Sequence, residues 1–393
     1  MSDSNPRTPG RHFLQIPGPS NVPDQVLRAM ARPTIDHRSP EFAQLTRRIL
    51  ENLGTVFQTE GPVLLFPSSG TGAWEAALVN TLSPGDRVLG FETGHFATLW
   101  RDVATRLGLE VEWVEGDWRH GVDLEALKSR LDHDPDHNLK AVLVVHSETS
   151  TGALSDVAGI RRTLDTSGHP ALLMVDTISS LASVDYRHDE WGVDVTVCCS
   201  QKGLMLPPGL GMTAASAKAL EASSTAGLPR SYWDWGPVLK MNEKGFFPYT
   251  PPTNLLFGMD EALAMILDEG LASVFARHRR LAGATRAAVR AWGMEMCCLD
   301  QDGWTDSLTA VWMPEGHDAD ELRRVILDRF DMSLGSGLGK VKGRLFRIGH
   351  LGDMNDLMLA GTLCGVEMGL ALAGVPHQEG GVAAALDFLS GSE

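Results

Sequence analysis

Short apolar runs alternate with helix-period segments from residue 63 onward, and this alternation is the strongest pattern in the chain. An apolar run of roughly four to eight residues is typical of a buried strand, and apolar residues every three or four positions are typical of a helix. The predicted strands are 63–66, 87–91, 111–114, 141–145, 171–175, 193–198 and 211–214. Helix-period segments lie between several of them, at 74–82, 98–107, 124–131 and 157–166. Strands separated by helices predict an α/β fold, with a seven-stranded and mainly parallel sheet covered on both faces.

The segments on either side of this pattern differ from it. Residues 1–21 are rich in Pro and Gly, and the prolines at 17 and 19 exclude a helix there. Long helical segments at 261–269 and 271–292 lead to strands at 308–312 and 345–348 and helices at 318–330 and 357–372. We therefore expect an N-terminal arm (1–21), a large domain (22–269) and a smaller α+β C-terminal domain (270–393).

Charge and cysteine content narrow the class of protein. The 393-residue chain has 34 Lys and Arg against 50 Asp and Glu, a net charge of −16, which disfavours nucleic acid and anionic membranes as partners. No apolar stretch is long enough to span a bilayer. Five cysteines without a framework spacing, and no signal-peptide pattern at the N-terminus, predict free thiols and a cytoplasmic protein.

Special residues follow several strands at their carboxyl ends, where ligands bind in sheets of this kind. Ser69-Gly70-Thr71-Gly72 follows the first strand, Asp176 follows the fifth, and Gln201 and Lys202 follow the sixth. This coincidence predicts one shared ligand site at that edge of the sheet.

Each of these residues has a functional and a structural interpretation. Burial lowers the pKa of a lysine, so Lys202 suits a Schiff base with an aldehyde cofactor, although a lysine after a strand is more often a solvated turn residue. Asp176 either keeps a heteroaromatic nitrogen protonated or caps a turn. The glycine-rich turn either holds an anion or simply joins strand to helix. Arg347, within an apolar strand, either binds a substrate carboxylate or forms an internal ion pair.

Two other patterns are interpreted as structural. His146-x-Glu148 has no suitably spaced third ligand, so no metal is expected. The glycine-rich segment 335–340 superficially resembles a phosphate loop but lacks the strand-then-helix context, and we interpret it as a flexible connection.

Taken together, the chain resembles the class V aminotransferases, which are fold-type-I pyridoxal-phosphate enzymes. Within them it is most similar to the serine–glyoxylate aminotransferases and their alanine– and aspartate–glyoxylate relatives. The motifs that carry the resemblance are Asp36-His37-Arg38-Ser39, Ser69-Gly70-Thr71-Gly72, Glu148-Thr149-Ser150-Thr151-Gly152, Ser200-Gln201-Lys202-Gly203, Pro248-Tyr249-Thr250-Pro251-Pro252 and Arg347-Ile348-Gly349-His350. The resemblance implies pyridoxal 5′-phosphate as the cofactor and a homodimer with active sites at the subunit interface.

The resemblance also implies a role for individual residues. Lys202 would form the Schiff base with the cofactor and then shuttle the substrate α-proton, and Asp176 would hold the pyridine nitrogen. The other implied cofactor contacts are Thr149 near the ring O3′ group, Phe96 stacked on the ring, Gly70, Thr71, Gly72 and Gln201 around the phosphate, and Thr250 on the phosphate of the partner subunit. Arg347 would bind the substrate α-carboxylate, with the backbone near Gly18 and Asn21 closing the other side.

One position departs from the family pattern. Phe247 stands where alanine-type relatives often carry a tyrosine, which removes a hydroxyl from the phosphate site unless Tyr249 replaces it.

The activity that follows from the resemblance is ping-pong transfer of an amino group from a small L-amino acid, with serine favoured, to glyoxylate, giving glycine and a 2-oxo acid. Alanine and aspartate remain alternative donors, and Arg38 is the candidate second cation for aspartate. A cysteine desulfurase or lyase of the same fold and a non-enzymatic cofactor-binding regulator are the rival classes.

Overall fold

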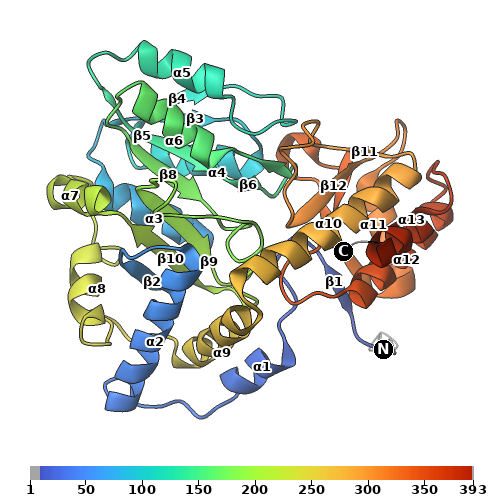
Figure 1. Cartoon of the computed structure of the whole chain (residues 1–393), viewed down its shortest axis with the longest axis horizontal. Helices are drawn as coiled ribbons and strands as arrows, with labels where there is room; N and C mark the ends of the chain where they lie inside the picture. The colour runs from blue at the N-terminus through green and yellow to red at the C-terminus, as the bar shows by residue number, and fades with distance from the viewer. Residues whose placement is uncertain (1–8, 392–393) are drawn as a thin grey trace, which may run out of the picture.

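Residues 9–391 are described in the computed structural model, so residues 1–8 of the expected arm lie outside the described range. A larger unit surrounds a seven-stranded sheet, and a smaller unit contains most of the C-terminal third of the chain (Figure 1). The large sheet has the strand order β2-β10-β9-β8-β5-β3-β4. Its strands are β2 (Val63–Ser68), β3 (Arg87–Phe91), β4 (Glu110–Val114), β5 (Leu139–Val145), β8 (Leu172–Asp176), β9 (Val195–Cys199) and β10 (Gly209–Ala215).

All seven predicted strands are present, with ends shifted by at most two residues. Strand β10 runs antiparallel to both of its neighbours, and the other neighbouring pairs in the sheet are parallel. The mainly parallel α/β sheet predicted from the apolar runs is therefore confirmed.

Helices cover both faces of the large sheet. The pleat sends Leu65 into the core on one face and Leu64 into the core on the other. The first face packs against α2 (Pro40–Phe57), α5 (Leu124–Asp132), α6 (Val157–Thr166) and α9 (Thr253–Glu269), and α1 (Asp24–Met30) contacts α9. The second face packs against α3 (Gly70–Thr81), α4 (His95–Arg106), α7 (Ala217–Thr225) and α8 (Trp235–Asn242).

Helices α3 and α4 begin earlier than their apolar periodicity predicts, at Gly70 and His95 instead of residues 74 and 98. Glycine has a low helix propensity, so the first turn of α3 is hidden in the sequence. The shift is important because it places Gly70, Thr71 and Gly72 within the first turn of a helix at the carboxyl end of β2.

The smaller unit is built on a five-stranded sheet with the order β1-β13-β14-β12-β11. These strands are β1 (Phe13–Gln15), β13 (Met332–Ser336), β14 (Leu345–Gly349), β12 (Leu308–Trp312) and β11 (Glu295–Met296). Its helices are α10 (Leu271–Ala291), α11 (Ala319–Phe330), α12 (Asp356–Leu372) and α13 (Gly381–Gly391). Strand β1 pairs in parallel with β13, so the N-terminal segment adds a strand to the sheet of the C-terminal unit.

The prediction of a flexible connection at 335–340 is wrong for most of that segment. Gly335 and Ser336 end β13 and pair with β14, and a 3₁₀ helix covers Gly339–Val341. The pairing gives β14, and with it Arg347, a hydrogen-bonded neighbour on each side.

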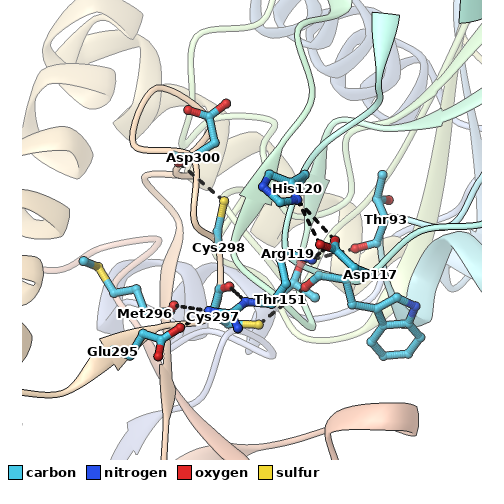
Figure 2. A network of polar contacts seen from close by, with 11 residues as sticks. Thr93, Asp117, Arg119, His120, Thr151, Glu295, Met296, Cys297, Cys298 and Asp300 are labelled. Carbon is cyan, nitrogen blue, oxygen red and sulfur yellow. Dashed lines mark hydrogen bonds and ion pairs between the residues drawn. The ribbon is translucent and has the colours of Figure 1, made fainter. Parts of the chain in front are cut away.

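The two units are joined through the hairpin of β6 (Ser147–Glu148) and β7 (Ala153–Leu154). The amide of Leu154 donates to the carbonyl of Gly303 at 2.7 Å, and the amide of Thr305 donates to the carbonyl of Gly152 at 3.0 Å. Beside this seam, Figure 2 shows Arg119 reaching the segment that holds Met296 and Cys297, where its guanidinium donates to the Met296 carbonyl at 3.3 Å. The hairpin that carries Thr149 is therefore fixed to the unit that carries Arg347.

None of the helices within residues 9–391 has the length and apolar character needed to cross a membrane.

Candidate active site

Lys202 lies just beyond β9 and is 8 % exposed. Its amine donates a hydrogen bond to the main-chain carbonyl of Pro17. Gly18 lies against the lysine stem, where any Cβ would collide with Lys202, and its φ of +91° also favours glycine. Burial and the nearby charge of Arg347 lower the pKa of Lys202 to about 8. About a tenth of this amine is therefore neutral, and nucleophilic, at pH 7, and about half at pH 8.

Asp176 is the last residue of β8 and is buried. Its two carboxyl oxygens accept hydrogen bonds from the Ile178 amide at 2.7 Å and from the Trp74 indole at 2.9 Å. Burial raises the pKa of Asp176 to about 7, although both hydrogen bonds oppose the rise. A protonated ring nitrogen would supply the positive partner that this carboxylate needs in order to stay ionised.

The start of α3 provides the features of an anion site. Its N-cap residue, Ser69, makes no side-chain capping hydrogen bond, and the helix opens with Gly70 and the exposed Thr71. A Cβ at Gly70 would collide with the Ile178 side chain, which would have to move to make room for it. On the facing loop, the Oε1 atom of Gln201 is buried and has no hydrogen-bond partner within the described chain. The free amide donors of a helix N-terminus suit a phosphate group, and Gln201 would donate to it through Nε2 and not through Oε1.

Arg347 projects from β14 and is 7 % exposed. Its Nε donates to the Ser336 carbonyl and its Nη1 to the Thr149 carbonyl, both at 2.8 Å. Burial lowers the pKa of Arg347 to about 10, and the charge of Glu148 opposes that change, so the guanidinium stays charged at neutral pH. These two hydrogen bonds leave Nη2 available for a substrate carboxylate.

Phe96 and Thr149 lie on adjoining segments. Phe96 is half-buried in the first turn of α4, and the hydroxyl of Thr149 is hydrogen-bonded to the Ser179 hydroxyl. The main-chain carbonyl of Thr149 meets Arg347, as described above. The structure thus brings Lys202, Arg347 and Thr149 together.

The backbone predicted to close the site near Gly18 and Asn21 is joined to the lysine loop, because Ser20 donates from its amide to the Gln201 carbonyl and from its hydroxyl to the Lys202 carbonyl. The side chain of Asn21 itself donates to the Leu14 carbonyl at 3.0 Å, toward β1. Two other predicted residues are not joined to this group within one chain. Arg38 and Thr250 are exposed, and no side-chain hydrogen bond or ion pair of theirs appears in the described part of the chain. For Thr250 this placement agrees with a role in a partner's site, which remains a prediction, as does the role of Arg38 toward an aspartate donor.

Tyr249 does not supply the hydroxyl that Phe247 lacks. Its hydroxyl donates to the Leu65 carbonyl at 2.6 Å, and burial raises its pKa. Phe247 packs edge-to-face against Phe42, with ring centroids 6.2 Å apart. Both side chains are used in core packing.

The structure adds residues to which sequence reasoning gave no role. Trp74 contacts Asp176, Ser179 contacts Thr149, and the Pro17 carbonyl accepts from Lys202. Trp74 follows the glycine turn by one helical turn, so an α3 starting at Gly70 would have placed it toward the sheet. The other two contacts join segments distant in sequence and left no local signal.

A cavity of about 1090 Å³ lies elsewhere between the two units, lined by residues such as Thr93, His146, Asp185, Arg286 and Trp304. Lys202, Asp176 and Arg347 are not among its lining residues. The site is therefore defined by the buried polar groups around the lysine and not by this cavity.

Taken together, the donor set fits pyridoxal 5′-phosphate. Lys202 offers an amine for its aldehyde, Asp176 a carboxylate for its ring nitrogen, and the start of α3 an anion site for its phosphate. These three groups come from strand ends β9, β8 and β2 of one sheet.

Comparison with known proteins agrees with this geometry. Residues 12–338 match the family model of the class V aminotransferases. The chain is 48% identical to a serine–glyoxylate aminotransferase of Arabidopsis thaliana over 97% of its own length and 96% of the relative's. It is 47% identical to an L-aspartate–glyoxylate aminotransferase of Paracoccus denitrificans over 98% and 96% of the two chains. The crystal structure of ureidoglycine–glyoxylate aminotransferase from Bacillus subtilis is similar, with a TM-score of 0.89 at 25% identity, over 98% of this chain and 100% of that one.

Proposed function

The chain belongs to the class V aminotransferases, and from that premise we propose that it moves the amino group of L-serine to glyoxylate, giving glycine and hydroxypyruvate. The cofactor is pyridoxal 5′-phosphate. When bound, it supplies an electron sink for the carbanion that forms at the α-carbon of the amino acid. The observation that carries the proposal is the buried, partly neutral amine of Lys202 in one site with Asp176 and Arg347. The chain is also similar in sequence to a serine–glyoxylate aminotransferase along nearly its whole length.

Residues of the chain remove the proton, hold the cofactor and bind the substrate carboxylate. Lys202 removes the proton from the donor α-carbon, for which a base with a pKa near the working pH is effective. Asp176 holds the proton on the ring nitrogen, and Arg347 fixes the α-carboxylate of the donor and then that of glyoxylate. Gly70, Thr71, Gly72 and Gln201 hold the phosphate, and Phe96 packs on the ring.

Donor choice depends on the side chain of the amino acid. Serine needs no second cation, whereas the distal carboxylate of aspartate does. We assign Arg38 of the partner subunit as the candidate for that carboxylate, because Arg38 is exposed in its own chain. Removing this charge with Arg38→Ala should lower kcat/KM for aspartate and leave that for serine unchanged; equal losses for both donors would contradict the assignment.

The burial and raised pKa of most of the cysteine thiols disfavour a cysteine desulfurase activity. Burial raises the pKa of Cys199 and of Cys297 to about 12 and that of Cys298 to about 11, so these thiols stay protonated and unreactive. Cys198 is also buried, and Cys364 is exposed on α12.

We also propose a homodimer in the cytoplasm, because free cysteines suit a reducing compartment and Thr250 is exposed in its own chain. Mixed dimers of Lys202→Ala and Thr250→Asp chains test the shared site. If Thr250 serves the partner, one site in each mixed dimer carries both changes and the other carries neither, so about half of the wild-type activity returns. If Thr250 serves its own chain, both sites are damaged and no activity returns.

The activity is tested by measuring glyoxylate-dependent conversion of L-serine to hydroxypyruvate, with L-alanine and L-aspartate as competing donors. We expect equimolar glycine and hydroxypyruvate, the highest kcat/KM with L-serine, and no turnover by Lys202→Ala. Turnover of Lys202→Ala at the wild-type rate, or no transfer from any donor, would contradict the proposal.

A further inference from the structure

Glu148 is fully buried, and its carboxylate is held by neutral donors. Its Oε1 accepts from the Ser150 hydroxyl at 2.6 Å and from the Ser150 amide at 3.0 Å, and its Oε2 accepts from the Ala97 amide at 3.1 Å. No ion pair within 4.0 Å joins it to a Lys, Arg or His of residues 9–391. The charge of Arg347 acts on Glu148 only through space, so the buried carboxylate depends on these neutral donors and the position calls for an explanation.

The carboxylate replaces an N-cap that α4 lacks. Gly94, the residue before this helix, has no side chain to accept from the first amides. Glu148 accepts from the amides of Phe96 (3.4 Å) and Ala97, and the Ser150 hydroxyl accepts from the His95 amide at 2.9 Å. The first turn of α4 is thus held by two residues of the β6–β7 hairpin. A negative charge at this end also interacts favourably with the positive, N-terminal end of the helix dipole.

Glycine at position 94 makes this arrangement possible. A Cβ there would lie 2.5 Å from the Glu148 Cγ and 2.5 Å from the Ser150 Oγ, which is closer than packed atoms allow. The backbone at Gly94 is extended, with φ 167°, so other residues could adopt the conformation. The requirement for glycine at this position is therefore one of space for the Glu148 side chain.

Glu148 also lies between three residues of the active site. It holds the turn that carries Phe96, it is followed directly by Thr149, and Thr149 accepts a hydrogen bond from Arg347. The hairpin that carries Glu148 is paired with the smaller unit through Gly152 and Leu154, as described above.

We propose that Glu148 is a positioning residue, which fixes the first turn of α4 so that the Phe96 ring lies at a set place against the cofactor. This inference rests on the cofactor site of the proposed function but not on the identity of the amino donor. Glu148 itself touches neither cofactor nor substrate in this proposal; its effect passes through Phe96.

Glu148→Gln tests the proposal, because it keeps the shape but places an NH₂ group among amide donors. We expect the Kd for pyridoxal 5′-phosphate to rise about tenfold and the visible circular dichroism of the bound cofactor to weaken. Asp318→Ala is the matched control, since Asp318 caps α11 in the smaller unit by accepting from the Asp320 amide at 2.7 Å. That control should lower Tm and leave Kd and the dichroism unchanged.

A double-mutant cycle separates positioning from general stability. If Glu148 acts through Phe96, then Glu148→Gln should change the cofactor Kd by less than about twofold in a Phe96→Ala background. If the two effects add fully, or if Glu148→Gln lowers Tm while Kd and dichroism stay at wild-type values, the proposal is wrong.

Gly94→Ala serves as a second variant if Glu148→Gln fails to fold. It keeps every charge and displaces the Glu148 side chain with a single methyl group, so the same rise in Kd is expected. An unchanged Kd in Gly94→Ala would also overturn the proposal. A wild-type protein that binds the cofactor but makes no glycine would contradict the proposed function alone, because these readouts need no amino donor.

Discussion

The indole of Trp74 donates a hydrogen bond of 2.9 Å to the carboxylate of Asp176. The bond opposes the rise in the pKa of Asp176 that burial causes, and so favours the ionised carboxylate. In the proposed function Asp176 must be ionised to hold a proton on the cofactor ring, and Trp74 would then support the electron sink.

Trp74→Phe should therefore lower kcat with L-serine about tenfold or more, in line with about 1.5–3 kcal/mol for a hydrogen bond to a charged group, and leave KM nearly unchanged. Trp100→Phe is the matched control. Trp100 stacks on Trp74 at 6.0 Å and is equally buried, but its indole N–H has no hydrogen-bond partner in the described chain. A similar kcat loss in both variants would show that only packing was disturbed.

Asp176→Ala should fold and bind cofactor but lose about 100-fold or more in kcat, a size typical of removing one charge-stabilising group from an active site. Reconstitution with N-methylated pyridoxal phosphate, whose ring nitrogen is permanently positive, should restore part of that loss. Unchanged kcat in Asp176→Ala, or no rescue by the methylated cofactor, would contradict the role of this carboxylate.

The pKa of Lys202 predicts how fast the cofactor-free protein takes up pyridoxal 5′-phosphate. Only the neutral amine attacks an aldehyde, and the lysine loses its proton as the pH rises through about 8. The rate of cofactor binding, followed by visible absorbance, should rise about tenfold per pH unit below pH 8 and level off above it. A rate that keeps rising beyond pH 10 would indicate an ordinary, solvated lysine.

Arg347→Lys should raise KM for both L-serine and glyoxylate by about tenfold or more, because a lysine cannot keep the two carbonyl contacts and also face a carboxylate with a planar fork. The cofactor Kd should stay at the wild-type value. A rise in KM for one substrate only would contradict a single carboxylate site used in both half-reactions.

The large sheet was predictable because strands buried on both faces are continuous apolar runs, as in residues 171–175. The pairing of Phe13–Gln15 with β13 was not, because a three-residue strand carries almost no periodic signal and its partner lies more than 300 residues away. The expected arm thus turned out to contain part of a sheet.

The residues of the candidate site also include some that the sequence predicts and some that it does not. Lys202 and Asp176 could be selected because polar residues after apolar strands are conspicuous and the family motifs surround them. Trp74 and Glu148 could not, because their roles depend on the contacts of buried atoms with Asp176 and the start of α4. Tyr249 could be judged only when its hydroxyl was seen to bond to Leu65.

The central claim is tested most directly by the two half-reactions, followed separately by absorbance. L-Serine added to the cofactor-loaded enzyme should remove the absorbance band of the lysine-bound cofactor and release hydroxypyruvate. Glyoxylate added next should restore the band and release one glycine per site. No spectral change with L-serine, or a band that glyoxylate fails to restore, would contradict a serine–glyoxylate aminotransferase.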